Sequence, residues 1–224
     1  MLVGGRVGPI VSADNAGPQE FRLERTGALV TQDAHGRYRE AASRGNIFAV
    51  STTLLGTTVV AANNSPIAAA AASILSIYNP LNSGINVSIL RTILGLVSGT
   101  PVAGPYVYNI AFNQNITATQ NNGGTSGASS INSYASGASG KARGFTQTAL
   151  TGSTAQVLYR PIAFSQIAAA IAATTPGLYT TEEVAGEIEL PPGGLLSIAS
   201  PGTGTSQVMY AAFVYEEIPS IGGQ

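Results

Sequence analysis

The sequence predicts an all-β protein whose strands form an antiparallel sandwich. About eight or nine short segments alternate apolar and polar side chains or are rich in β-branched residues, as strands are. The 27 glycines and 12 prolines provide turns between these segments. The segments do not recur at a fixed period, so a propeller or a solenoid is not expected. We therefore expect a β-sandwich with at most one helix.

An extended arm and a hairpin are expected at the N-terminus. Residues 1–18 are mainly Gly, Pro and small residues, which is typical of an arm. Residues 21–25 alternate apolar and charged side chains, the pattern of a half-buried strand. The turn pair Thr26-Gly27 then leads into residues 28–31. Together these segments predict a small hairpin.

The attachment unit is expected to end near Gly45. Residues 37–40, Arg-Tyr-Arg-Glu, predict another short strand. Eleven of the 21 charged residues lie in the first 44 positions, and the composition changes abruptly after them. We therefore expect residues 1–45 to form an arm and hairpin used for attachment, and residues 46–224 to form the sandwich.

The sandwich strands are expected in the segments that follow. They are residues 47–51, 57–62, 74–78, 87–97, 106–112, 157–159, 187–190, 195–199 and 207–215. Tyr106, Tyr108, Ile110 and Phe112 would share one face of their strand, because side chains alternate along a strand. Ile167 and Ile171, four apart in an Ala-rich run, predict one short helix.

A long low-complexity insertion is expected at about residues 113–156. Its run from Asn121 to Gly144 consists mainly of Gly, Ser, Asn and Ala, and Ser126–Ser129 recurs as Ser136–Ser139. A connection this long is uncommon in a compact domain unless it is functional or disordered. Two alternatives stay open, a mobile loop and a loop ordered against a neighbouring subunit.

The scarcity of charge predicts a chain that is packed in an assembly. Only 9% of the residues are charged, against about 25% in ordinary soluble domains. The formal charge is +1 over residues 1–44, +4 over 45–181 and -6 over 182–224, so opposite ends of neighbouring copies can attract. The net charge of -1 argues against nucleic acid as a partner.

The absence of cysteine excludes disulfides and thiolate metal sites, and fits folding in a reducing cytoplasm. The start of the chain lacks the basic-then-apolar order of a signal peptide. The longest apolar stretch, residues 67–78, is shorter than the ~20 residues that span a bilayer. We therefore expect no membrane partner.

Few residues suit catalysis. His35 is the only histidine and lies in a polar turn, so no metal centre is expected. Glu187 and Glu189 would share one strand face, and two carboxylates can serve glycoside hydrolysis. The chain has no Trp platform to hold a sugar, so a solvated or intersubunit face is favoured. Gly140-Lys141 departs from a phosphate-binding loop at two positions. We expect no enzyme and no cofactor.

The dense basic set near the N-terminus is the candidate contact surface. Its arginines could dock on an acidic protein surface, or could form a hairpin face balanced by nearby acidic residues. Apolar neighbours would add buried area to a contact. The predicted capsid or subunit contacts are Phe21, Arg22, Leu23, Arg25, Leu29, Val30, Arg37, Arg39 and Arg44.

Several motifs carry a resemblance to a family of virion proteins. Residues 186–198 read as a strand, a Pro-Gly turn and a second strand, and residues 207–219 follow as another strand. Upstream, residues 75–84 read Leu-Ser-Ile-Tyr-Asn-Pro-Leu-Asn-Ser-Gly. This combination resembles jelly-roll structural proteins of tailed bacteriophages, namely head decoration (cement), head spike and fibre-base proteins. The resemblance covers residues 46–112 and 157–219.

This resemblance implies a jelly-roll sandwich that forms homo-oligomers, often trimers, with an N-terminal arm that grips the capsid or a neighbour. The function expected from it is a non-enzymatic virion structural protein, assembled in the host cytoplasm, that decorates or cements the capsid. Its partners would be itself and the major capsid protein or another virion protein. The alternative is a receptor-binding, glycan-binding module of a phage tail fibre or spike.

Overall fold

The structure is a computed structural model that describes most of the chain. The described residues are 37–118, 139–165, 179–203 and 206–220, with three two-residue strands at 5–6, 21–22 and 131–132. The chain divides into two compact units, Met1–Glu40 and Ala41–Gln224.

In the first unit, β1 (Gly5–Arg6) pairs in parallel with β2 (Phe21–Arg22). β2 lies where a strand is predicted, but its partner comes from the expected arm. The other half of the predicted hairpin, residues 28–31, lies outside the described residues.

The strand predicted at residues 37–40 is wrong. Arg37 and Tyr38 form a turn, and helix α1 (Arg39–Ser43) follows. Its residues Glu and Ala are good helix formers. Gly45 ends the helix with a φ of +73°, and its N–H donates to the carbonyl of Ala42 at 2.9 Å. Four alternating residues are too few to distinguish a strand from a helix turn.

The second unit consists mainly of two antiparallel sheets, which confirms the predicted all-β sandwich. The five-stranded sheet has the order β10-β7-β12-β5-β9. Its strands are β5 (Leu75–Tyr78), β7 (Gly104–Ala111), β9 (Arg143–Phe145), β10 (Val157–Ser165) and β12 (Leu195–Ala199).

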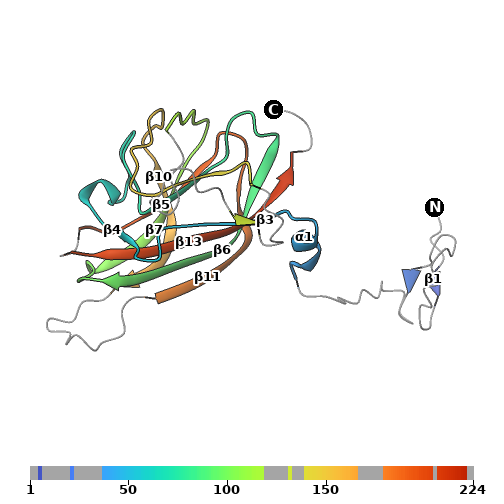
Figure 1. Ribbon diagram of the computed structural model, residues 1–224, viewed down its shortest axis with the longest axis horizontal. Helices are drawn as coiled ribbons and strands as arrows, with labels where there is room; N and C mark the ends of the chain where they lie inside the picture. Colours follow the sequence, from blue (N-terminus) through green and yellow to red (C-terminus); the bar gives the residue numbers. More distant parts are fainter. Residues whose placement is uncertain are drawn as a thin grey trace. The chain divides into compact units, whose positions relative to one another are not determined.

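The second sheet has six strands, with the order β11-β6-β13-β3-β8 and β4 added beside β13. They are β3 (Ile47–Ser51), β4 (Thr57–Thr58), β6 (Ile85–Ser98), β8 (Ile131–Asn132), β11 (Tyr179–Leu190) and β13 (Val208–Pro219). Figure 1 shows the two sheets as layers, with β11, β6 and β13 in one and β10, β7 and β5 in the other.

One predicted strand ends early. Only Thr57 and Thr58 of residues 57–62 form a strand, and η1 (Ala61–Asn63) is a turn of 3-10 helix. The buried Asn63 side chain accepts a hydrogen bond from the Val60 N–H at 2.8 Å, which turns the backbone away from the sheet. The helix predicted around Ile167 and Ile171 lies outside the described residues.

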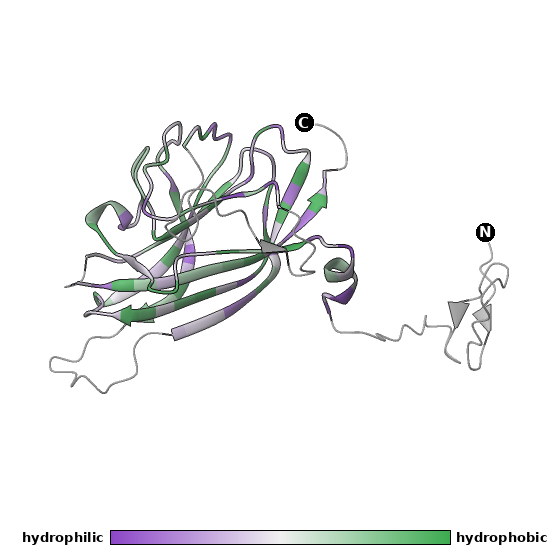
Figure 2. Ribbon diagram, in the orientation of Figure 1, coloured by the Kyte–Doolittle hydropathy of each residue, from purple (hydrophilic) through white to green (hydrophobic). Residues whose placement is uncertain are grey.

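The core lies between the two sheets. Its largest buried side chains include Tyr106, Tyr108, Phe213 and Tyr215. Phe48 stacks on Tyr215 with ring centroids 5.8 Å apart. Figure 2 shows the apolar colour along much of β6 and β13, the central strands of the six-stranded sheet. Such burial contributes about 1.5–3 kcal/mol for each large apolar side chain.

Part of the predicted insertion belongs to the sandwich itself. Two short strands within residues 113–156 extend the sheets, since β8 pairs with β3 and β9 pairs with β5. Phe145 and Leu150 are fully buried and pack with Tyr78 and Leu195 in a second small core. Neither open alternative, a mobile loop or a loop ordered by a neighbour, describes these strands and buried residues, and residues 119–130 and 133–138 of the insertion lie outside the described residues.

Candidate functional site

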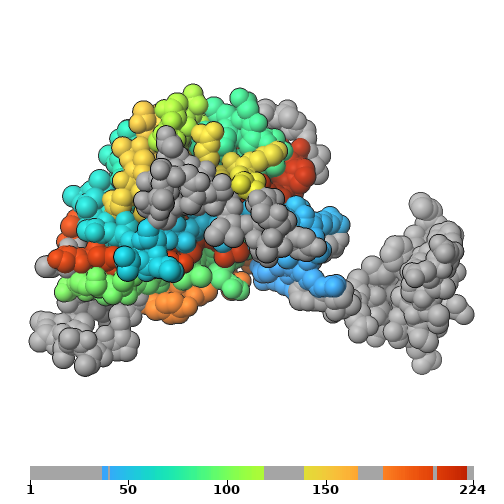
Figure 3. Space-filling model, viewed as in Figure 1, coloured from blue at the N-terminus to red at the C-terminus, as the bar shows by residue number. Residues whose placement is uncertain are grey.

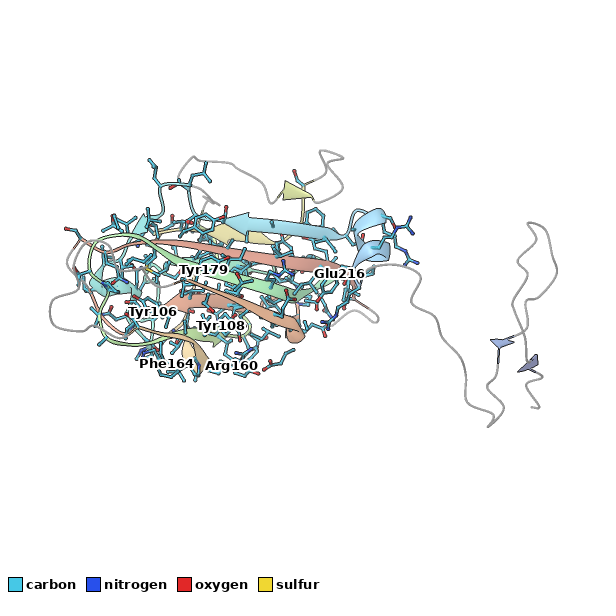
Figure 4. The ribbon with its side chains drawn as sticks, turned by 90° about the horizontal axis from the view of Figure 1, so that it is seen from below. Tyr106, Tyr108, Arg160, Phe164, Tyr179 and Glu216 are labelled. Carbon is cyan, nitrogen blue, oxygen red and sulfur yellow. The ribbon has the colours of Figure 1, made fainter. Side chains whose placement is uncertain are left out.

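One side of the sandwich is bounded by β10 and β11, and we call these two strands the open edge. β10 is the outermost strand of one sheet and β11 is the outermost strand of the other. Arg160 in β10 joins them, because its guanidinium pairs with Glu182 and, at 3.0 Å, with Glu187, both in β11. In Figure 4, Arg160, Tyr108 and Phe164 lie at the same side of the sandwich.

A β-bulge in β11 allows one arginine to meet both carboxylates. Residues five apart in a regular strand point to opposite faces, because side chains alternate. The pairing of β11 with β6 shifts between Glu183 and Ile188. Within the bulge, Ala185 and Gly186 have φ values of +57° and +87°. β11 advances five residues from Glu183 to Ile188 while β6 advances two, from Arg91 to Ile89. The extra residues redirect the chain, so that Glu182 and Glu187 both reach Arg160.

Tyr108 supports this ion pair from inside the sandwich. Its hydroxyl lies 2.6 Å from Thr92 Oγ1 and 2.7 Å from Glu182 Oε2. A phenol has a single proton and an ionised carboxylate only accepts, so Tyr108 donates to Glu182 and accepts from the Thr92 hydroxyl. Burial raises the pKa of Tyr108, and Glu182 raises it further, while Thr92 and Arg160 act in the opposite direction. The phenol therefore stays protonated at physiological pH.

Two aromatic rings lie against the Arg160 guanidinium. Its guanidinium carbon lies 5.2 Å from the centroid of Tyr108 and 5.9 Å from that of Tyr159. The Tyr159 hydroxyl also donates to Glu187 at 3.1 Å. These ion pairs and hydrogen bonds hold the two sheets together, which is a structural role. Glu189, for which a solvated or intersubunit strand face shared with Glu187 was favoured, is exposed like Glu187 and accepts from Asn86 Nδ2 at 2.7 Å.

The open edge exposes large apolar side chains. They are Val157 (67% exposed), Leu158, Tyr159 and Phe164 (67%) in β10, and Tyr179 (73%) at the start of β11. Figure 3 shows β11, coloured orange, on the molecular surface beside β6. Clustered exposed apolar groups of this kind mark contact surfaces.

The backbone of β10 is poorly suited to adding another strand. Pro161 has no N–H to donate, and the pairing with β7 shifts on both sides of it. A partner at this edge would therefore contact its side chains, not extend its hydrogen-bond ladder.

An apolar groove adjoins the first residues of β10. It has a volume of about 630 Å³ and is lined by Ser65, Pro66, Pro105, Val107, Gln156, Val157, Leu158 and Pro201. Gln156 is 2% exposed, and neither its Oε1 nor its Nε2 has a hydrogen-bond partner. Leaving such a buried group unpaired costs about 1–3 kcal/mol, so this amide is suited to a partner that brings a polar group.

A second cavity, of about 670 Å³, is lined by Tyr78, Pro80, Leu81, Asn82, Ser83, Asn115, Ile116, Lys141 and Arg143. Lys141 and Arg143 both line the cavity, while Ala142 between them is buried. Lys141 Nζ donates to the Ser83 carbonyl at 2.9 Å. Neither side chain pairs with a carboxylate of the described residues, unlike Arg91 and Arg160.

The two residues before β9, Lys141 and Ala142, are held by a carboxylate on β13. Glu217 Oε1 accepts the backbone N–H of Lys141 at 2.6 Å and that of Ala142 at 2.9 Å. Burial raises the pKa of Glu217, and these two N–H groups and the charge of Lys141 partly offset that rise.

The predicted contact residues are only partly described. Phe21 and Arg22 form β2, while Leu23, Arg25, Leu29 and Val30 lie outside the described residues. Arg37, Arg39 and Arg44 are exposed. The guanidinium of Arg37 packs over the Tyr38 ring at 5.3 Å. Burial raises the pKa of Glu216, and the nearby charge of Arg44 lowers it.

The comparisons with known proteins assign no family. No model of a known protein family matches the chain, and no curated protein sequence matches it. Across the described ranges, no three His, Cys, Asp or Glu side chains are grouped so that they could hold a metal ion. The described residues also contain no helix with both the length and the apolar character needed to cross a membrane.

Proposed function

We propose that the chain is a non-enzymatic structural protein of a tailed-bacteriophage virion, which decorates or cements the capsid as a homo-oligomer, most simply a trimer. The observation that carries this proposal is the open edge, where β10 and the start of β11 expose apolar side chains to solvent. In a chain with only 9% charged residues, such a surface favours contact with another copy.

We place the sandwich in the jelly-roll class, and its strand order supports this. Without the short β4, β8 and β9, the sheets read β11-β6-β13-β3 and β10-β7-β12-β5. The successive pairs β3/β5, β6/β7, β10/β11 and β12/β13 are each divided between the sheets. Eight antiparallel strands connected in this way form the two Greek keys of a jelly roll.

The energetics favour apolar contacts over ionic ones at the open edge. A surface ion pair contributes about 0–1 kcal/mol, whereas burying a Phe or Leu side chain contributes about 1.5–3 kcal/mol. Arg160, Glu182 and Glu187 already pair with one another within the chain. They are therefore expected to rigidify the edge, while the apolar side chains bind the neighbour.

The N-terminal unit is the proposed grip on the capsid. It contains most of the predicted contact residues, and Arg37 and Arg39 are exposed in it. The partner we propose is an acidic surface of the major capsid protein or of another virion protein.

Co-sedimentation with phage heads assembled without this chain tests the virion role. We expect the full chain to co-sediment, and the variant carrying Arg37→Glu and Arg39→Glu to bind more weakly, most clearly at low salt because exposed charges are screened within about 10 Å at 0.1 M. Arg91→Gln, which removes a cation that pairs with Glu183, is the matched control. Failure of the full chain to co-sediment at any salt concentration would contradict the proposal.

A second candidate function, glycan binding, is favoured by the cavity that Lys141 and Arg143 line. Arg binds carboxylates through two parallel hydrogen bonds, Lys adds a point charge, and the amides of Asn82 and Asn115 suit sugar hydroxyls. The ligand class would be a sugar acid. Saturation-transfer NMR with N-acetylneuraminic acid and with neutral N-acetylglucosamine tests this. Equal signals from both sugars, or signals unchanged in Arg143→Gln, would exclude it.

A further inference from the structure

The turn between β3 and β4 carries two leucines that the sandwich leaves uncovered. Leu54 is 91% exposed and Leu55 is 82% exposed, the highest exposures of any large apolar residues described. The turn is well defined, because the Gly56 N–H donates to the Thr53 carbonyl and the Thr53 hydroxyl donates to the Gly56 carbonyl, both at 2.8 Å. This turn is therefore a fixed apolar projection.

The groove beside β10 is apolar like the turn and carries an unpaired polar group. Three prolines and the side chains of Val107, Val157 and Leu158 form apolar walls, and the groove volume is about 630 Å³. The buried Gln156 amide in its lining lacks both a donor and an acceptor partner. A peptide group offers one donor and one acceptor, which are the two groups that this amide lacks.

The projection and the groove lie on opposite sides of the sandwich. In the six-stranded sheet, β11 is at one edge, and β3, which leads into the Leu54–Leu55 turn, is separated from it by β6 and β13. The groove lies with β10, whose Arg160 joins β10 to β11. One copy cannot fill its own groove with a turn on the far side, whereas the next copy can.

We propose that Leu54 and Leu55 of one copy insert into the β10 groove of the next copy, with the turn backbone bonded to Gln156. This contact joins two different surfaces, so it is head-to-tail, and repetition with a closing rotation gives a ring. This inference rests on the proposed homo-oligomeric function and specifies which two surfaces of neighbouring copies are in contact. Val157 and Leu158, which are exposed in the isolated chain, become buried in this contact.

Two variants of the full chain test this contact by complementation. Leu54→Ser with Leu55→Ser removes the projection and keeps the groove. Val157→Asp places a charge in the apolar groove and keeps the projection. Both changes are at exposed positions, so each variant is expected to fold, which circular dichroism and thermal melting would verify. Leu81→Ser, at an exposed apolar position just after β5 and outside both the turn and the groove lining, is the matched control.

Sedimentation velocity gives the readout. We expect each variant alone to be monomeric, the control to keep the wild-type mass, and an equimolar mixture of the two variants to form a one-to-one dimer that grows no further. Variants that keep the wild-type oligomer would overturn the contact and leave the oligomeric function standing. A mixture that stays monomeric would overturn the head-to-tail geometry. A monomeric wild-type chain would contradict the oligomeric function itself.

Discussion

Tyr108→Phe isolates the hydroxyl that links the two sheets beneath Arg160. This change removes one neutral hydrogen bond, to Thr92 at 2.6 Å, and one bond to the charged Glu182 at 2.7 Å. A neutral bond contributes about 0.5–1.5 kcal/mol and a bond to a charge about 1.5–3 kcal/mol. Glu182 keeps Arg160 as a partner, so we expect a loss near the lower end of the sum, about 2–3 kcal/mol.

Thermal and urea unfolding measure this loss. For a domain of this size each kcal/mol lowers the melting temperature by about 2–4 °C, so a decrease of about 4–12 °C is expected. Tyr159→Phe is the matched control, since it removes a hydroxyl from a partly exposed ring bonded to Glu187 at 3.1 Å. The control should lose less than about 0.5 kcal/mol. Equal losses in the two variants would refute the idea that Tyr108 fastens the sheets.

A double-mutant cycle separates the contribution of the Tyr108–Thr92 hydrogen bond from that of the Tyr108–Glu182 hydrogen bond. Thr92→Val combined with Tyr108→Phe should destabilise the protein by less than the sum of the two single changes, because both remove the same bond. Additive losses would show that the two hydroxyls do not interact.

Two further predictions concern backbone and charge. Gly99→Ala should cost more than about 2 kcal/mol, because a positive φ costs a non-glycine residue about 1–2 kcal/mol and the new Cβ would lie 2.1 Å from the Ser206 carbonyl oxygen. Gly84→Ala, also at positive φ but with nothing within 4 Å, should cost only about 1 kcal/mol in the same urea titration. Glu217→Ala should destabilise the domain by about 1–3 kcal/mol, because two N–H groups lose their acceptor, while Glu217→Gln keeps an acceptor. The pKa of Glu217 is raised in the folded protein, so the stability that this shift contributes is present below the ordinary pKa of 4.5 and is lost as the pH rises. The stability of Glu217→Gln relative to wild type should therefore increase between pH 4 and 7. A constant difference across that range would contradict this assignment.

The sandwich itself could be predicted because strands leave a local signal. The apolar β3 and β12 were predicted with their observed bounds, and β6 and β7 to within a few residues. The predicted strands 157–159 and 187–190 cover only part of β10 (Val157–Ser165) and β11 (Tyr179–Leu190). At η1, the predicted strand ended early because the Asn63 side chain makes a local bond that competes with strand pairing. At α1, a short charged pattern resembled a strand and formed a helix.

The open edge could not be predicted from the sequence. Arg160 and Glu182 are 22 residues apart, and the bulge that brings Glu187 to the same arginine depends on Ala185-Gly186 at positive φ. Of the residues that form this site, only Gly186 can be recognised in the sequence as a candidate for a bulge. The exposed leucines at 54 and 55 lie between two predicted strands and resemble core residues in the sequence. The groove beside β10 is assembled from four segments that only the fold brings together.

Sedimentation equilibrium of the full wild-type chain at tens of micromolar tests the central claim most directly. The account predicts a single species whose mass is a small multiple of 22.7 kDa, with three copies as the expected number. Phe164→Asp and Leu158→Asp, which place charges on the open edge, should shift that species toward one copy, whereas Leu81→Asp, at an exposed position after β5, should not. A wild-type chain that remains at 22.7 kDa across this concentration range would contradict the account.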